Sequence, residues 1–204
     1  MNFTMQDLSK EMLIIAALRQ IPFEGWTKAA FKKAEEAEGL TAGTYAAYFP
    51  GGLPDFIKAL HKWVDGEMQR KIAAQPDFNE QKIREKIFRC VMARIHTVAP
   101  HREAMRRLAG HQLLPWNKIA ALRDLGCAVD AMWKLAGDRS IDYNFYTKRI
   151  LLSGVYVSTL HHWFDDTSEA FESTQTFLRA RIENVLKFGK FVGGIKEKFG
   201  KKAA

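Results

Sequence analysis

The chain has few cysteines and no long apolar run. Its 204 residues include two cysteines, Cys90 and Cys127, too few for a disulfide framework or a cysteine-rich zinc site, so we expect a reducing compartment. No run approaches the roughly 20 apolar residues that a membrane-spanning helix needs. The first apolar run, residues 12–18, is short and follows Asp7 and Glu11. We therefore expect neither a signal peptide nor a membrane-spanning helix.

Alternating polar and apolar residues, the pattern of half-buried strands, are also absent, whereas apolar residues recur at spacings of three and four. The sequence therefore predicts an all-α fold whose helices end at proline and glycine. The expected helices cover residues 5–20, 27–39, 41–49, 54–75, 79–98, 102–109, 115–136, 142–164 and 168–188.

Recognisable catalytic, metal and phosphate-binding motifs are missing as well. No helix carries a His-x-x-x-His or Glu-x-x-His spacing, and Gly51-Gly52 lacks the Lys and Ser of a phosphate-binding loop. His161-His162 lies near two aspartates, but adjacent residues point to different sides of a helix. Arg89 could lower the pKa of the neighbouring Cys90. Because no histidine is placed to pair with Cys90, we favour an ordinary packed thiol. We expect no catalytic residue, no metal and no cofactor.

Acidic residues are scarce near the C-terminus. Residues 177–204 contain eight basic and two acidic residues and carry +6 of the net charge of +8. Apolar residues there follow one helical face, namely Phe188, Phe191, Val192, Ile195 and Phe199. Lysines lie opposite or flank that face, namely Lys187, Lys190, Lys198 and Lys201. This pattern is typical of an interfacial helix on an anionic membrane; a packed last helix or a solvated end is the alternative.

The first three expected helices have the spacing of a helix-turn-helix. Residues 25–49, with Gly43-Thr44-Tyr45-Ala46-Ala47-Tyr48-Phe49, resemble the DNA-binding domain of tetracycline-repressor-type regulators. The expected recognition helix, residues 41–49, contains no Lys or Arg, and the preceding helix ends in Glu35, Glu36 and Glu38. Because phosphate neutralisation supplies much of the affinity for DNA, we favour a scaffold retained for packing over a DNA-reading helix.

The most specific stretch is residues 130–149, which read Asp-x-Met-Trp-x-x-Ala-Gly-Asp-x-Ser-x-Asp-x-Asn-x-Tyr-Thr-x-Arg, where x marks a variable position. It resembles the signature of the ninth protein family of the ubiquinone (coenzyme Q) biosynthesis series. The resemblance implies a tetracycline-repressor-like, homodimeric protein that binds an isoprenoid quinone intermediate or a phospholipid. It further implies a surface patch for the di-iron demethoxy-quinone hydroxylase and a C-terminal amphipathic helix on the membrane.

The site residues follow from this stretch. The lipid-binding or partner patch is expected at Met132, Trp133, Phe145, Tyr146, Leu152 and Tyr156, with Phe145 where relatives often have Trp. The structural residues of the motif are expected to be Asp138, Asp142, Asn144 and Arg149. Asp138 suits a turn, Asp142 suits the cap of the next helix, and Arg149 could pair with one of the aspartates. The helix over 143–164 is apolar on most sides, so it needs a dimer partner, a cavity or the core to cover it.

Three segments are expected: a helix-turn-helix-like domain (1–53), a larger helical lipid-binding and dimerisation domain (54–186) and the basic amphipathic tail (187–204). The leading interpretation is a non-enzymatic, lipid-binding accessory protein of ubiquinone biosynthesis, cytoplasmic and peripheral on the inner face of a bacterial inner membrane. A ligand-responsive DNA-binding repressor is the alternative, and an enzyme with an unrecognised site is a third interpretation.

Overall fold

The computed structural model describes the backbone of residues 5–138 and 143–200, and the side chains of residues 10–138 and 145–187. Every regular element within these ranges is helical, which confirms the all-α prediction. The α-helices are α1 (Met5–Glu24), α2 (Lys28–Ala37), α3 (Thr44–Tyr48), α4 (Leu53–Ala73), α5 (Ile83–Val98), α6 (Arg102–Gln112), α7 (Lys118–Leu135), α8 (Tyr143–Phe164) and α9 (Glu172–Gly200). Short 3-10 turns precede α5, α6, α7 and α9.

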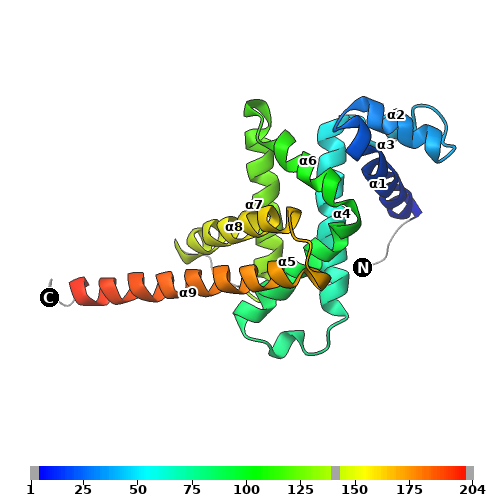
Figure 1. The fold of residues 1–204 in the computed structure, drawn as a ribbon. Coiled ribbons are helices and arrows are strands. Elements are labelled where there is room, and N and C mark those ends of the chain that lie inside the picture. The colour runs from blue at the N-terminus through cyan, green and yellow to red at the C-terminus, as the bar shows by residue number, and fades with distance from the viewer. Residues whose placement is uncertain (1–4, 139–142, 201–204) are drawn as a thin grey trace.

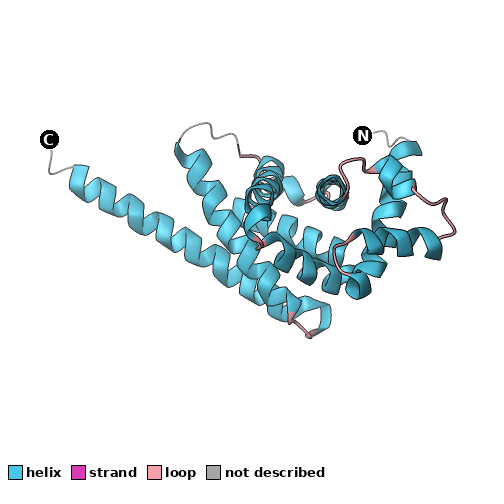
Figure 2. Cartoon of the chain, turned by 90° about the horizontal axis from the view of Figure 1, so that it is seen from above, coloured by secondary structure: helices cyan, strands magenta, loops and turns pink. Residues whose placement is uncertain are grey.

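The helices form two groups around α4. Figure 1 shows α1, α2 and α3 gathered at one end of the molecule, while α5 to α9 pack on the other side of α4. α8 and α9 run side by side, and the C-terminal half of α9 extends beyond the other helices in both views (Figures 1 and 2). Within the described residues, no helix is long and apolar enough to cross a membrane.

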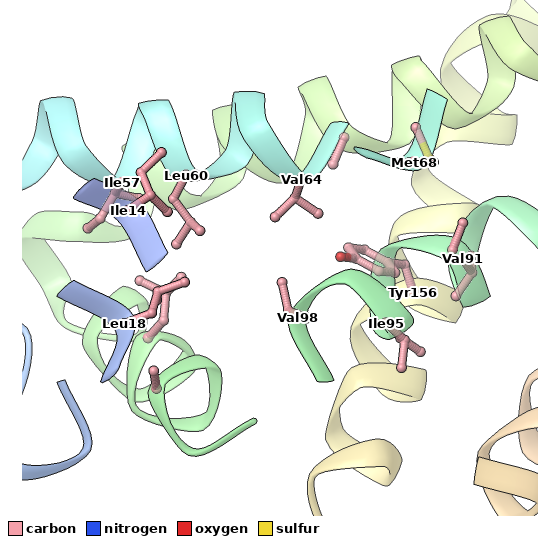
Figure 3. Packing of buried hydrophobic residues seen from close by; sticks show 14 of the residues in the cluster. Ile14, Leu18, Ile57, Leu60, Val64, Met68, Val91, Ile95, Val98 and Tyr156 are labelled. Atoms are coloured by element: carbon pink, nitrogen blue, oxygen red, sulfur yellow. The ribbon is translucent and has the colours of Figure 1, made fainter. Parts of the chain in front are cut away.

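One face of α4 organises the core. Ile57, Leu60, Val64 and Met68 are all buried, and their spacing of three and four places them on one side of the helix. Figure 3 shows them pointing at α1 on one side and at α5 on the other, with Tyr156 of α8 lying between α4 and α5. This shared core joins the N-terminal helices to the larger group.

The N-terminal group is held by aromatic packing. Phe31 stacks on Tyr45 with ring centroids 4.9 Å apart, and Phe56 of α4 packs edge-on against Phe49 at 5.2 Å. The indole N–H of Trp26 donates to the carbonyl of Ala104 in α6 at 3.1 Å. Trp26 therefore ties the first three helices to the rest of the chain across the predicted boundary at residue 53.

The expected end of the first helix was wrong. α1 does not stop at residue 20 but continues to Glu24, with Pro22 in its last turn. Proline there removes one hydrogen bond near a helix end, where carbonyls already lack partners. The end is set by Gly25 instead, which has φ +70° and donates its N–H to the carbonyl of Ile21 at 2.9 Å.

Two other expected boundaries also differ. α3 begins at Thr44 rather than 41, because Gly43 adopts φ +89°, which is outside the helical region. The last helix does not end at residue 188, because α9 runs without interruption from Glu172 to Gly200. The segment predicted as a separate tail therefore begins inside a long helix.

Candidate partner and lipid-contact site

The turn between α7 and α8 begins with a glycine cap. Gly137 has φ +89° and donates its N–H to Lys134 at 3.1 Å, while the N–H of Asp138 donates to the carbonyl of Trp133 at 2.9 Å. These are the two backbone hydrogen bonds of a Schellman motif. The predicted break at Gly137 is thereby explained, and the cap directs the Asp138 side chain toward α8.

Arg149 and Lys148 of α8 bind Asp130 of α7 and Asp138 of the turn that follows α7. Arg149 contacts both candidate aspartates: its Nε and Nη2 lie 2.9 and 2.5 Å from one oxygen of Asp130, and its Nη1 lies 3.3 Å from Asp138. Lys148 Nζ lies 2.7 Å from Asp138, whose side chain is only 4% exposed. Two cations therefore compensate a buried carboxylate, which stabilises the hairpin.

The electrostatic environment of Asp130 agrees with this geometry. Partial burial raises the pKa of Asp130, but hydrogen bonds from Lys134 and Arg149 outweigh burial and hold the pKa below its ordinary value. Asp130 is therefore a permanently charged anchor at neutral pH.

This ionic network supports a layer of aromatic side chains. Arg149 lies over the Phe145 ring, 3.4 Å from its centroid, and the indole N–H of Trp133 donates to the carbonyl of Lys148 at 3.2 Å. Trp133 and Phe145 are half-buried. Tyr146 meets Phe145 edge to face at 5.1 Å but is 67% exposed. The structure thus brings Trp133, Phe145 and Tyr146 together, with Tyr146 outermost.

The other three residues of the expected patch lie in the interior. Met132, Leu152 and Tyr156 are all buried in the hydrophobic core. The Tyr156 hydroxyl accepts a hydrogen bond from Arg94 Nε at 3.0 Å. In this conformation these side chains do not reach the surface, so only Trp133, Phe145 and Tyr146 can meet a partner directly.

An open groove runs along the surface between α8 and α9. Its volume is about 400 Å³. Apolar side chains line most of it, and Arg181 stands among them with Ser158 and Asn184. Ile150, which lines the groove, is 71% exposed. A groove with apolar walls and one cation suits an acyl or prenyl chain, or the same face of a second protomer.

Several expected site residues fall outside the described parts of the chain. Asp142 lies outside the described residues, as does Lys201, and the Asn144 side chain is not described. The side chains of Phe188, Lys190, Phe191, Val192, Ile195, Lys198 and Phe199 are likewise outside the described set, although their backbone belongs to α9. Lys187 is exposed. The helical backbone places the five apolar positions on one side of α9 by their spacing.

Sequence reasoning missed a buried polar cluster between α4 and α5. Arg94 of α5 is 2% exposed and forms an ion pair with Asp65 of α4. The pKa of the nearby His61 is lowered to about 4. Burial is the main cause and the positive charge of Arg94 adds to it, whereas the negative charge of Asp124 acts in the opposite direction. The Nε2 atoms of His61 and Gln112 lie 3.4 Å apart, a pairing that suits a neutral imidazole acceptor. An arginine flanked by Ala93 and Ile95 in an apolar helix was the available signal.

A second missed residue is Asp166, which starts α9. Its carboxylate accepts the N–H of Ser168 and the N–H of Thr174, both at 2.8 Å. Although burial raises the pKa of Asp166, these bonds and those from the two hydroxyls hold it well below the ordinary range. The bond from the N–H of Ser168 forms an Asx turn, and the bond from the N–H of Thr174 satisfies a donor in the first turn of α9. The local Asp-x-Ser spacing was therefore a visible signal, whereas the contact with Thr174 was not.

One of the acidic residues of the helix-turn-helix-like group, Glu35, is buried and does not contribute its charge to the surface. Glu35 is 8% exposed, and its two oxygens accept the N–H groups of Gly43 at 3.1 Å and Tyr45 at 2.8 Å. Glu35 therefore caps α3 from inside. α3 itself contains no Lys or Arg, so the helix in the recognition position offers no cation to a phosphate.

The surroundings of Cys90 and of His161-His162 do not suit a reactive thiol or a metal site. Cys90 is fully buried, and burial raises the pKa of its thiol to about 12, whereas Arg89 is bound to Asp77 at 2.9 Å. His162 stacks on Phe177 at 4.4 Å, while His161 faces Phe164. In the described ranges, three or more potential metal ligands of the His, Cys, Asp and Glu types do not gather at one point.

Known proteins resemble the chain in sequence and, separately, in fold. The COQ9 family model matches residues 119–189, which span α7, α8 and the first part of α9. The chain is 28% identical over 193 residues to a protein of Rattus norvegicus named "Ubiquinone biosynthesis protein COQ9, mitochondrial", covering 92% of this chain and 62% of the relative. It is 29% identical over 203 residues to COQ9-B of Xenopus laevis, covering 92% and 66%, and 26% identical to the Homo sapiens protein, covering 92% and 61%.

The chain thus spans less than two thirds of the length of these curated relatives. Among solved structures, a TetR transcriptional regulator from Nitrosomonas europaea superposes with a TM-score of 0.71 at 18% identity, covering 86% of this chain and 97% of the regulator. At that identity the likeness concerns the fold. The chain is therefore similar in sequence to the COQ9 ubiquinone biosynthesis proteins, and its all-α fold is tetracycline-repressor-like.

Proposed function

We propose that the chain is a non-enzymatic, lipid-binding accessory protein of ubiquinone biosynthesis that presents a quinone intermediate to the demethoxy-quinone hydroxylase at a membrane. The observation that carries this proposal is the similarity, over 92% of the chain, to proteins named for ubiquinone biosynthesis. The features that support it on the molecule are the aromatic cluster of Trp133, Phe145 and Tyr146 and the groove between α8 and α9.

In this proposal the two features have different roles. Tyr146 and its half-buried neighbours form the contact surface for the hydroxylase, held in place by the Asp130–Arg149 network. The groove takes up an isoprenoid quinone or a phospholipid, whose transfer to an apolar surface is favourable by about 0.8 kcal/mol per buried CH₂. The groove face also pairs two protomers in a homodimer, which covers the exposed side chains of Ile150 and Val157.

The C-terminal part of α9 supplies the membrane contact. Its apolar positions share one helical side, and lysines surround them. Each basic residue near an anionic surface contributes about 1 kcal/mol. We propose that the protein is peripheral on the inner face of a bacterial inner membrane.

Organic extraction of the purified protein, followed by mass spectrometry, tests the proposal. We expect an isoprenoid quinone or a phospholipid to be released in proportion to protein. Ile150→Arg in the groove should reduce the released lipid, whereas Phe23→Arg, at an 81% exposed site on α1, should not. Extracts without lipid would contradict the proposal.

A DNA-binding repressor is the second candidate, since the fold is that of a regulator. A gel shift with the DNA upstream of its own coding sequence distinguishes the two. We expect no shift, because α3 contains no Lys or Arg that could contact DNA phosphates. Lipid-free protein with specific operator binding would favour the repressor.

A further inference from the structure

The turn between α6 and α7 carries a concentrated apolar surface that the proposed function does not use. Of the thirteen exposed large hydrophobic side chains among the described residues, five lie between residues 113 and 122. These corner residues are Leu113 (72% exposed), Leu114 (37%), Trp116 (75%), Ile119 (85%) and Leu122 (68%). An exposed apolar cluster of this kind marks an interaction surface.

We infer that this corner is a second membrane-contact surface, separate from the C-terminal helix, which inserts Trp116 and its aliphatic neighbours into the interface of an anionic bilayer. The corner residues lie where α6 turns into α7, at an extremity of the molecule away from α1–α3 and from the end of α9 (Figure 1). A projecting corner can enter a lipid interface, where tryptophan is enriched.

The charge around the corner fits an anionic membrane. Residues 104–123 contain four basic residues and no acid. Lys118 and Arg123 are exposed beside the apolar side chains, and Arg106 and Arg107 are exposed on α6. Three of these bases form ion pairs: Arg106 with Asp165 at 2.8 Å, Arg107 with Glu103 at 3.1 Å and Arg123 with Asp124 at 3.4 Å. Asp124 is only 8% exposed, so the basic groups Lys118 and Arg123 dominate the surface beside the apolar side chains.

The groups facing the corner from other helices do not reverse this charge. α4 contributes His61, whose Nε2 lies 3.4 Å from Nε2 of Gln112. Basic groups that surround an apolar cluster are typical of interfacial segments, and the attraction to anionic lipid adds to the burial of apolar area.

The backbone of the corner is internally hydrogen-bonded. The N–H of Leu113 donates to Ala109 at 3.2 Å, that of Leu114 to His111 at 3.3 Å and that of Asn117 to Leu114 at 2.9 Å. Pro115 has no N–H, and the Asn117 side chain donates to His111 at 2.9 Å. A backbone that satisfies its own polar groups can enter a weakly hydrated region at lower free-energy cost.

Trp116 provides a direct reporter. Trp26 and Trp163 are buried and Trp63 and Trp133 are half-buried, so Trp116 is the exposed tryptophan of the chain. The full-length protein is mixed with vesicles of phosphatidylcholine and phosphatidylglycerol, some with brominated acyl chains. We expect a blue shift of the emission and quenching by bromine with the mixed vesicles, and neither with phosphatidylcholine alone. Trp116→Phe should remove both signals while retaining vesicle binding.

Matched variants test the surface itself. Ile119→Asn with Leu122→Asn should weaken binding to the mixed vesicles by about tenfold or more. Met12→Asn with Phe23→Asn, at sites that are 72% and 81% exposed on α1, should leave it within about twofold. A chain lacking residues 187–204 should still show bromine quenching of Trp116, which separates the corner from the tail.

Two results would overturn the inference. One is vesicle binding without any quenching of Trp116, which would mean that the C-terminal helix alone meets the bilayer. The other is a blue shift that appears without vesicles and depends on protein concentration, which would identify a second copy of the chain as the occupant of the corner.

Discussion

Arg149 donates two hydrogen bonds to a single oxygen of Asp130, from Nε at 2.9 Å and from Nη2 at 2.5 Å. The same guanidinium reaches Asp138 through Nη1 and covers the Phe145 ring. One side chain of α8 therefore joins the end of α7, the cap of the turn and the aromatic layer of the proposed partner surface.

This relationship predicts a strong energetic coupling between the two residues. Arg149→Met should lower the free energy of unfolding by about 1–3 kcal/mol, because Asp130 and Asp138 lose their shared cation and keep only Lys134 and Lys148, respectively. Asp130→Asn should lower it less, since Arg149 keeps Asp138. A double-mutant cycle in urea should give a coupling of about 1–2 kcal/mol. Strictly additive effects would contradict the proposed network.

Tyr146 should matter for partner binding and not for folding. Its side chain is 67% exposed, so Tyr146→Ala should change the stability by less than about 0.5 kcal/mol. The same change should weaken binding to the co-expressed hydroxylase by about tenfold or more, as expected for an aromatic interface residue. Phe23→Ala is the matched control, because Phe23 is equally aromatic and 81% exposed on α1. Equal effects of the two substitutions would show that Tyr146 is not part of the partner surface.

His61 should make the protein sensitive to mild acid. Its pKa is lowered to about 4 in the fold, from an ordinary value of 6.5. A lowered histidine pKa means that the unfolded chain binds the proton first. The stabilisation is therefore complete above about pH 6.5 and is lost as the pH falls toward 4.

Between pH 7 and pH 5 this histidine should reduce the free energy of unfolding by about 1–2 kcal/mol. His61→Gln should be less sensitive to pH over that range, because Gln112, Arg94 and Asp124 then face a side chain that does not titrate. Urea titrations at the two pH values measure the difference. Parallel pH profiles of the two proteins would show that His61 is not the sensitive group.

Deleting residues 187–204 should weaken flotation with anionic liposomes. The deletion removes six lysines and the apolar side of the C-terminal helix, and each lysine contributes about 1 kcal/mol near such a surface. Raising the salt concentration should weaken the binding of the intact chain in the same direction. Unchanged flotation of the shortened chain would exclude the tail as a membrane contact.

The sequence predicted the helices well where proline and glycine mark their ends. Gly137 is an example, because its positive φ closes α7 where expected. Pro22 misled the prediction, since proline is tolerated in the last turn of a helix when a following glycine provides the cap. The sequence predicted that Arg149 pairs with an aspartate, but the motif offers three, Asp130, Asp138 and Asp142. In the structure Arg149 binds both Asp130 and Asp138.

Burial within α8 could not be predicted in the same way. This helix is apolar on most sides, so periodicity alone does not distinguish Tyr156, which is buried, from Tyr146, which is exposed. The choice depends on where α4, α5 and α7 lie against α8. The partnership of Arg94 with Asp65 likewise joins residues 29 positions apart on two helices, a distance over which spacing gives no information.

Withdrawal of a quinone from vesicles tests the central claim most directly. Vesicles that contain a radiolabelled demethoxy-quinone are mixed with the protein and then separated by flotation. We predict that label moves into the protein fraction in proportion to the protein added, and that Ile150→Arg in the groove reduces the transfer while Phe23→Arg does not. Label that stays entirely with the vesicles, although the protein itself binds them, would contradict the account.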